Sequence, residues 1–238
     1  MDLPAYLVSY NLASLPLDYP WNSELFNTFW APTDESNPRL ASQINSITTK
    51  AAYALGIACS EWVIARVDGH AETADSLLRT EAAWTASLDR SYAKLPLPDR
   101  IPPSDPQEYA YPLLLAMRLA AYAHQTLGGS GVGVRTCAHG LAALVDHIAG
   151  RHPAFAPWLS DSLRRCATHF PDAGVPLDQQ EAVPKDFFEP GFVWRDGMAI
   201  PALERFVATL DPTKNPYLHS ADAMRAAGFT GVPYGPAP

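Results

Sequence analysis

Several recurrent signatures of protein function are missing from this chain of 238 residues. Its three cysteines lie far apart and form no CxxC pair, which argues against a disulfide framework and against a cysteine zinc site. The chain does not open with a basic segment followed by an apolar stretch, and it has no uninterrupted apolar run of membrane-spanning length. We therefore expect a cytoplasmic protein without a membrane span, whose cysteines act as small buried hydrophobic residues.

Positive charge is scarce as well. The chain has 17 Lys and Arg against 25 Asp and Glu, so its net charge is −8. Nucleic acids and anionic membranes attract proteins through clustered cations, and the Lys and Arg residues of this chain are scattered. These observations predict neither a nucleic-acid partner nor a membrane partner.

Catalytic and cofactor motifs are missing too. The stretch LGGSGVGVRT at 127–136 contains two glycines, Gly128 and Gly133, with the spacing of a phosphate-binding loop. However, Val134 stands where that loop needs Lys, and the preceding segment has the pattern of a helix rather than a strand. We interpret the stretch as a joint between two helices, with Gly128 and Gly129 ending the first in left-handed backbone. We expect no cofactor.

The period-two alternation of β-branched residues that marks strands is also absent. From Arg39 onward, apolar residues recur at steps of three and four, the pattern of helices with one buried face. The predicted helices are 39–67, 71–93, 113–127, 133–150 and 155–170, with short turns or helices at 185–189, 201–210 and 220–227. We predict an all-α fold, a single-domain helical bundle of about five or six main helices, with the apolar segment 113–127 at its centre.

The predicted domain covers residues 1–238 and has three parts. Residues 1–38 form an irregular arm that is rich in aromatic residues and holds five acidic residues but no Lys or Arg. Residues 39–171 form the helical core. Residues 172–238 form a loop-rich part with short helices. The excess of negative charge is therefore concentrated in the arm.

Two pairs of polar residues are candidates for chemistry. Glu81 falls on the inward face of its helix and needs a partner, for which Arg66 on the preceding helix is the candidate. This pair either fixes the helical hairpin or acts as an acid–base group in a cleft. His139 and Asp146 share a helix face with Arg135, which we interpret as a solvated polar face because HExxH and HxH spacings are absent. We expect no catalytic residue and no metal.

The arm is the first candidate for a binding surface, because aromatic side chains anchor interfaces and charge steers association. The alternative is that its aromatic side chains only pack over the core. The proline-rich connection 95–106 is the second candidate, since it is expected to be exposed. The predicted partner-binding residues are Asp18, Trp21, Glu24, Trp30, Asp34, Glu35, Asp99 and Asp105.

Four stretches carry a resemblance to a known family: ACSEWVIARVDG (58–69), EAAWTASLDRSYAKLP (81–96), YPLLLAMRLAAYAH (111–124) and HPAFAPWLSDSLRRCATHFP (152–171). They resemble an uncharacterised family of all-helical bacterial proteins associated with type VI secretion toxin loci, where immunity proteins are encoded. The resemblance covers about residues 40–171 and rests on Trp and small apolar residues at helical spacing. It implies a protein that binds and neutralises a toxin, and it carries over no catalytic residue.

These observations predict a protein-binding module, an immunity or antitoxin protein whose partner is a cognate toxin or effector protein. Two alternatives stay open. One is a helical enzyme with an unrecognised site built on one of the polar pairs, and the other is an adaptor or chaperone that loads an effector. The sequence also leaves open whether the chain forms a homodimer.

Overall fold

The computed structural model describes residues 2–99 and 110–234, and over these residues the predicted all-α fold is confirmed. The described residues form ten α-helices and four short 3₁₀ turns, and they contain isolated β-bridges but no longer strand. The helix number exceeds the predicted five or six because short helices form in the arm and because one predicted helix is divided. Within these residues, no helix is both long enough and apolar enough to cross a membrane.

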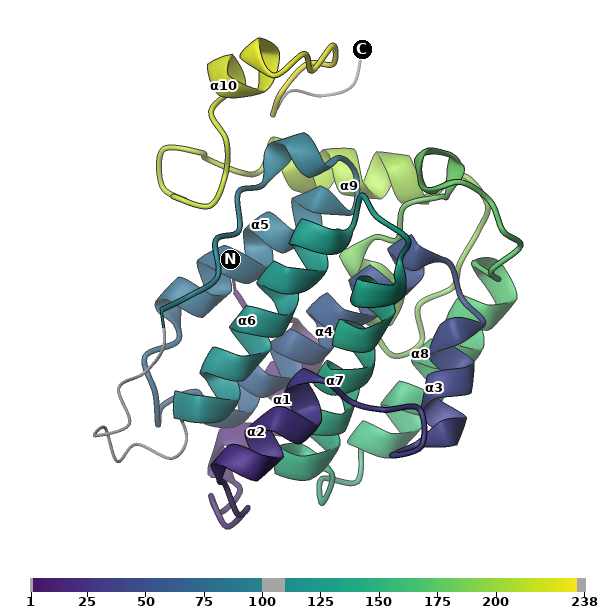
Figure 1. The fold of residues 1–238 in the computed structure, drawn as a ribbon. Coiled ribbons are helices and arrows are strands. Elements are labelled where there is room, and N and C mark those ends of the chain that lie inside the picture. The colour runs from purple at the N-terminus through teal and green to yellow at the C-terminus, as the bar shows by residue number, and fades with distance from the viewer. Residues whose placement is uncertain (1, 100–109, 235–238) are drawn as a thin grey trace.

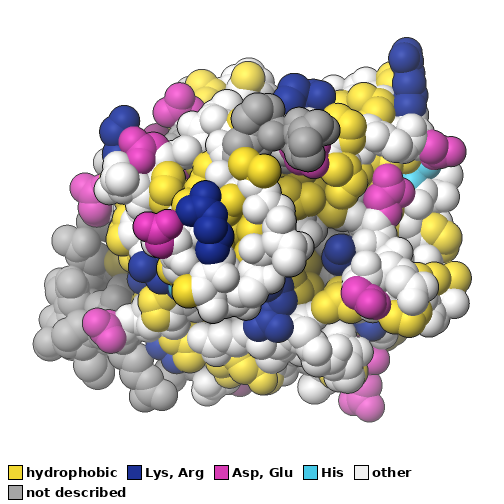
Figure 2. Space-filling model, turned by 90° about the horizontal axis from the view of Figure 1, so that it is seen from above, with side chains coloured by type: hydrophobic (Ala, Val, Ile, Leu, Met, Phe, Trp, Pro, Cys, Tyr) yellow, Lys and Arg dark blue, Asp and Glu magenta, His cyan; other side chains and the backbone are white. Residues whose placement is uncertain are grey.

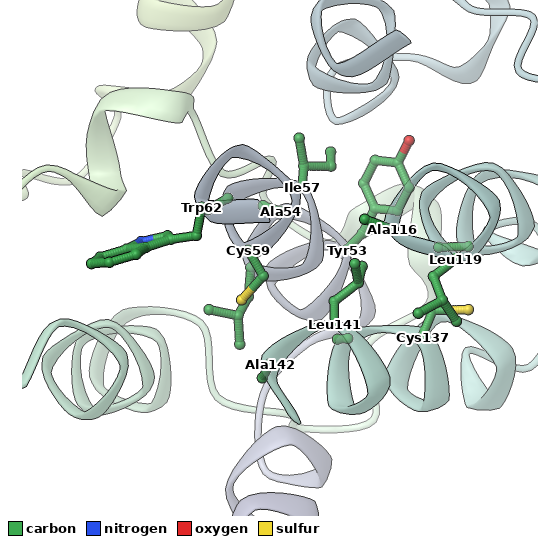
Figure 3. Close-up of a cluster of buried hydrophobic side chains, with 14 of the residues drawn as sticks. Tyr53, Ala54, Ile57, Cys59, Trp62, Ala116, Leu119, Cys137, Leu141 and Ala142 are labelled. Atoms are coloured by element: carbon green, nitrogen blue, oxygen red, sulfur yellow. The ribbon is translucent and has the colours of Figure 1, made fainter. Parts of the chain in front are cut away.

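The centre of the bundle is α4 (Thr49–Val67), in which every residue except Lys50 is buried. Its side chains point outward on all sides into neighbouring helices (Figure 3). The helices α5 (Ala74–Ala86), α6 (Ala110–Thr126) and α7 (Val132–Ala149) pack around it (Figure 1). The prediction that segment 113–127 is central was wrong, because α6 keeps an exposed edge while α4 is enclosed on every side.

Small residues let α4 and α7 lie close together. A Cβ atom added at Gly56 of α4 would lie 3.3 Å from Leu141 Cδ1 and 3.6 Å from Ala138 Cα of α7. All three cysteines are free and buried, in agreement with their predicted packing role. Burial raises the pKa of the Cys137 and Cys166 thiols to about 12, so these groups stay protonated at neutral pH.

The predicted helix 39–67 is two helices, α3 (Pro38–Asn45) and α4. Polar residues at the break cap α4 in place of a continuous helix, since the Thr48 side chain accepts a hydrogen bond from the Ala51 amide at 3.2 Å. The Thr48 amide in turn donates to the Phe170 carbonyl at 2.9 Å, just after α8 (Phe155–His169). Periodicity could not reveal this break because apolar residues continue across it in phase.

The prediction that the arm is irregular was wrong. It contains α1 (Ala5–Tyr10) and α2 (Ser23–Trp30), and Asn22 caps α2 by accepting from the Leu25 amide at 2.8 Å. Each of these helices buries a single residue, Leu7 in α1 and Phe29 in α2. Helices this short repeat their apolar pattern too few times for periodicity to show.

The C-terminal part contains α9 (Ala199–Ala208) and α10 (Ala221–Ala226), so its predicted short helices are confirmed. A 3₁₀ turn at Lys185–Phe188 inserts two aromatic rings into the core. The prediction of a helix over 71–93 was too long, because α5 ends at Ala86 and a separate 3₁₀ turn, Arg90–Tyr92, follows.

The glycine-rich stretch is the predicted joint, between α6 and α7. The left-handed residue is Gly131, with φ of 79°, rather than Gly128 or Gly129. Gly131 stands before the first residue of α7, and a Cβ atom there would lie 2.5 Å from Thr49 Oγ1 of α4. Glycine is required at this position because the backbone conformation and the close contact both exclude a side chain.

Candidate binding groove

A groove of about 540 Å³ lies between α2, α3, α7 and α8. Its apolar lining includes Phe29, Leu40 and Phe155, all three of which belong to the hydrophobic core. Polar side chains from α3 and α7 stand among these apolar groups; they are Arg39, Gln43, His139, Asp146 and His147. The groove therefore combines an apolar surface with groups that can donate and accept hydrogen bonds.

The wall formed by α2 is set by its contact with α7. A Cβ atom added at Gly140 of α7 would lie 2.1 Å from the Phe29 carbonyl oxygen, so the two backbones approach as closely as only glycine allows. Next to this contact the His147 ring lies 5.3 Å from the Phe29 ring and 6.3 Å from the Trp21 ring, centroid to centroid. His147 Nε2 also lies 2.7 Å from the Pro20 carbonyl oxygen. One side of α7 thus fixes the arm in place.

His139 lies where this groove meets a second cavity of about 290 Å³, which Pro32 and Asp34 of the α2–α3 connection help to line. The side chain is only 3% exposed, and its Nε2 atom has no hydrogen-bond partner among the described residues. Burial lowers the pKa of His139 below its ordinary value, and the Asp34 carboxylate opposes that shift. At neutral pH His139 is therefore a neutral imidazole with one ring nitrogen free for a ligand.

The predicted solvated face is confirmed for Asp146 but was wrong for His139. His139 is buried because the α2–α3 connection covers that part of α7. Asp146 is exposed and lies two helical turns further along, about 10 Å from His139 at 1.5 Å per residue. Arg135 Nη2 donates to Asp172 Oδ2 at 2.6 Å and to the Ile47 carbonyl at 3.1 Å. His139 and Asp146 therefore line the same groove at different heights, and Arg135 is engaged elsewhere.

Two of the predicted partner-binding residues, Asp34 and Glu35, are exposed in the α2–α3 connection beside this groove. Glu24 is exposed in the first turn of α2. The buried Phe29 lies on the opposite side of this helix. None of the three belongs to an ion pair of the described residues. Their carboxylates are therefore available to a partner.

The remaining predicted residues are more varied in their surroundings. Asp18 forms an exposed ion pair with Arg151. Trp21 stacks on Phe29 with centroids 6.1 Å apart, and Trp30 lies 5.7 Å from the Tyr122 ring, so both half-buried rings pack on the bundle. Asp99 is exposed, while Asp105 lies outside the described residues, as does most of the connection 95–106.

The predicted pairing of Glu81 with Arg66 was wrong. Arg66 donates to the carbonyl oxygens of Ile148 at 2.9 Å and Pro16 at 2.6 Å, and so it ties the arm to the end of α7. Glu81 Oε2 instead accepts from Asn215 Nδ2 at 3.0 Å. Helix periodicity predicts the face on which a side chain lies. It does not predict that irregular segments place backbone carbonyls close to Arg66 and the Asn215 amide close to Glu81.

A buried carboxylate that was not predicted from the sequence is Glu61, which is 1% exposed in the middle of α4. Its Oε1 atom accepts hydrogen bonds from Trp84 Nε1 and from Lys185 Nζ, both at 3.0 Å. Burial raises the pKa of Glu61, and Lys185 opposes this shift. The signal was an acidic residue within an otherwise apolar run, but Lys185 is too distant in the chain for any spacing rule to pair them.

Comparisons with family models, with curated proteins and with solved structures found no match to this chain. Among residues 2–99 and 110–234, no group of three or more His, Cys, Asp or Glu side chains is placed to hold a metal ion.

Proposed function

We propose that this chain is a protein-binding module that neutralises a cognate bacterial toxin in the cytoplasm, and that the groove beside α2 and α3 is its binding surface. The observation that carries the proposal is the apolar lining of this groove next to the exposed, unpaired carboxylates of Asp34 and Glu35. An apolar recess with charge at its rim is the usual arrangement of a protein interface.

The charges indicate the chemistry of the partner. All five charged side chains of the arm are carboxylates, and the net charge of the whole chain is −8. Arg39 and Asp146 line the groove as well, so charges of both signs are available there to fix the orientation of a bound segment. We expect a toxin surface that is basic overall and places an apolar side chain in the groove.

The proposal is tested with the product of the gene next to the one encoding this chain. The two proteins are expected to copurify, and this chain is expected to abolish the toxicity of its partner. Absence of binding would contradict the proposal. Binding without neutralisation would instead favour the adaptor or chaperone alternative.

The surface is tested with the double substitution Asp34→Lys/Glu35→Lys. At low salt this variant should associate about tenfold more slowly, because reversed charges repel a basic partner during encounter. The control is Asp2→Lys/Asp222→Lys, which changes the net charge equally at exposed positions that do not line the groove. Equal slowing by both variants would show a general charge effect and would exclude the groove as the interface.

A second candidate function, a helical enzyme, is favoured by one observation. The Nε2 atom of His139 is buried without a partner at the junction of two cavities, which is the position of a general base or of a ligand-binding group. The substitution His139→Gln separates the two functions. It should abolish turnover if His139 is catalytic, whereas binding of the partner should weaken only in part, because His139 is one of many residues that line the groove.

A further inference from the structure

A separate cavity of about 520 Å³ lies at the C-terminal end of α6 and shares no lining residue with the groove. It is open to solvent and is lined by exposed Arg90 and Lys94, by Leu95 and Pro96, by the last turn of α6, and by the segment around Tyr217. Figure 2 views the molecule from the end that carries α10, where Lys and Arg side chains stand beside hydrophobic ones.

Backbone pairing builds this cavity. Ala93 and Leu218 form an antiparallel bridge, in which the Lys94 amide donates to the Tyr217 carbonyl and the His219 amide donates to the Tyr92 carbonyl, both at 2.9 Å. The C-terminal segment is thereby held against the chain that follows α5. As a result Lys94 and Tyr217 line the same cavity although they are far apart in the sequence.

Among the described residues, the charged groups that line the cavity are cationic or can become so: Arg90, Lys94 and His124. Neither Arg90 nor Lys94 belongs to an ion pair of the described residues. The Asp75 carboxylate, which accepts from the Tyr217 hydroxyl, is already paired with Arg79 at 2.8 Å. Among the residues that the structure describes, no carboxylate lines this cavity, and the nearby Asp75 is engaged by Arg79 and Tyr217.

His124 is 7% exposed, and its Nδ1 atom has no partner among the described residues. The pKa of His124 is lowered to about 4, mainly by burial and also by the charges of Arg90 and His219, while a hydrogen bond with the Ala93 backbone opposes this shift. Burial and the charge of Lys94 also lower the pKa of His219. The cationic groups around the cavity therefore disfavour one another, and a bound anion would relieve this repulsion.

Gly128 of the glycine-rich stretch gives Arg90 its position. A Cβ atom at Gly128 would lie 2.2 Å from Arg90 Nη1, so the guanidinium rests directly against the backbone of the joint between α6 and α7. The obstructing atom is the end of a flexible side chain, so Gly128→Ala would displace the guanidinium rather than the helices. Gly128 therefore leaves space for the Arg90 guanidinium in addition to joining α6 to α7.

We propose that this cavity binds a phosphate group carried by a small molecule with a flat apolar body. Arg90 and Lys94 supply the charged donors, and guanidinium and ammonium groups are the usual partners of phosphate in proteins. Leu95, Pro96 and the Tyr217 ring supply an apolar wall for the body of the ligand. The proposal is independent of toxin binding, since the two surfaces have no lining residue in common.

The test titrates the full chain with inorganic phosphate, phenyl phosphate and benzoate, and follows backbone amide chemical shifts and calorimetric affinity. Phenyl phosphate is expected to bind most tightly, with shifts at Lys94, Gln125 and Tyr217. Absence of binding by both phosphate compounds would overturn the proposal. Equal or tighter binding of benzoate would overturn the assignment to phosphate.

Variants locate the bound phosphate. Arg90→Gln and Lys94→Gln should each weaken phenyl phosphate binding by about tenfold, the expected loss of one charged hydrogen bond. The controls Arg151→Gln and Arg164→Gln remove exposed cations on other parts of the chain, and they should leave the affinity unchanged. Equal affinities for all four variants, with unfolding midpoints like that of the unsubstituted protein, would overturn the proposal.

Gly128→Ala supplies an independent check. It should weaken phenyl phosphate binding in the unsubstituted chain and have little further effect in Arg90→Gln, because it acts by moving the Arg90 side chain. Additive effects of the two substitutions would show that Gly128 does not position Arg90 for the ligand.

Discussion

At the scale of single residues, the buried carboxylate of Glu61 depends on partners from two other parts of the chain. Trp84 of α5 and Lys185 of the 3₁₀ turn Lys185–Phe188 both donate to it. Because a buried charge without a counter-ion is costly, the turn is held to the core by electrostatics as well as by its aromatic rings. Lys185 thereby links the C-terminal part to the central helix.

Lys185→Met should lower the free energy of unfolding by about 3 kcal/mol at neutral pH, since it leaves Glu61 buried and unpaired. Adding Glu61→Gln should recover much of this loss, because the amide oxygen can still accept from Trp84. Urea unfolding measures both. The loss should also shrink in acid, where Glu61 takes up a proton and its charge disappears. A loss that is independent of pH would contradict the role given to the charge.

His124 should make the protein less stable in acid. Its folded-state pKa of about 4 lies below the ordinary 6.5, so the unfolded chain takes up a proton first as the pH falls. The stability lost between about pH 6.5 and about pH 4.5 from this group is about 2 kcal/mol. Urea unfolding at both pH values should show that His124→Gln loses less stability than the unsubstituted protein by this amount. Identical losses would show that His124 titrates normally.

At the scale of secondary-structure elements, the position of α2 follows from one close contact with α7. The Phe29 carbonyl lies so close to Gly140 that no side chain fits at position 140. The helix of the arm can therefore approach α7 closely enough to form one wall of the groove. The wall is set by a glycine in the middle of a buried helix, where propensity alone would favour alanine.

Gly140→Ala should lower the free energy of unfolding by about 1–3 kcal/mol, although alanine favours the helix, because overpacking forces the backbones apart. Displacement of α2 should also change the fluorescence of the neighbouring Trp21 and weaken binding of the partner. Thr136→Ala on the same helix is the control, since among the described residues its hydroxyl donates to the Val132 carbonyl within α7. Stabilisation by Gly140→Ala would contradict the close contact.

At the scale of the whole molecule, one hydrophobic cluster connects the arm, the helical core and the C-terminal part. It includes Leu7 of α1, Trp62 of α4, Phe188 after α8 and Leu218 near the end of the described chain. The aromatic rings contribute to this continuity: the Trp62 ring lies 5.6 Å from Tyr10 and 5.2 Å from Trp158. The arm therefore contributes to the core besides carrying negative charge on its exposed side.

The predicted single domain should unfold in one cooperative transition, because the same cluster includes residues from all three parts of the chain. Circular dichroism in the far ultraviolet and tryptophan fluorescence should report the same midpoint in urea. Two separated transitions would contradict the single domain, and a first transition confined to fluorescence would indicate that the arm or the C-terminal part unfolds independently.

The sequence by itself determined the helical class. Apolar residues recur at helical steps within each of α4, α7 and α8, and this spacing can be recognised in each segment without knowledge of the others. It also determined where the negative charge of the arm lies, since composition does not depend on folding. Only the tertiary structure decided that Arg66 binds backbone carbonyls, that Lys185 reaches Glu61, and that Arg90, Lys94 and His124 surround one cavity. These arrangements join segments far apart in the chain through irregular connections, for which no sequence period exists.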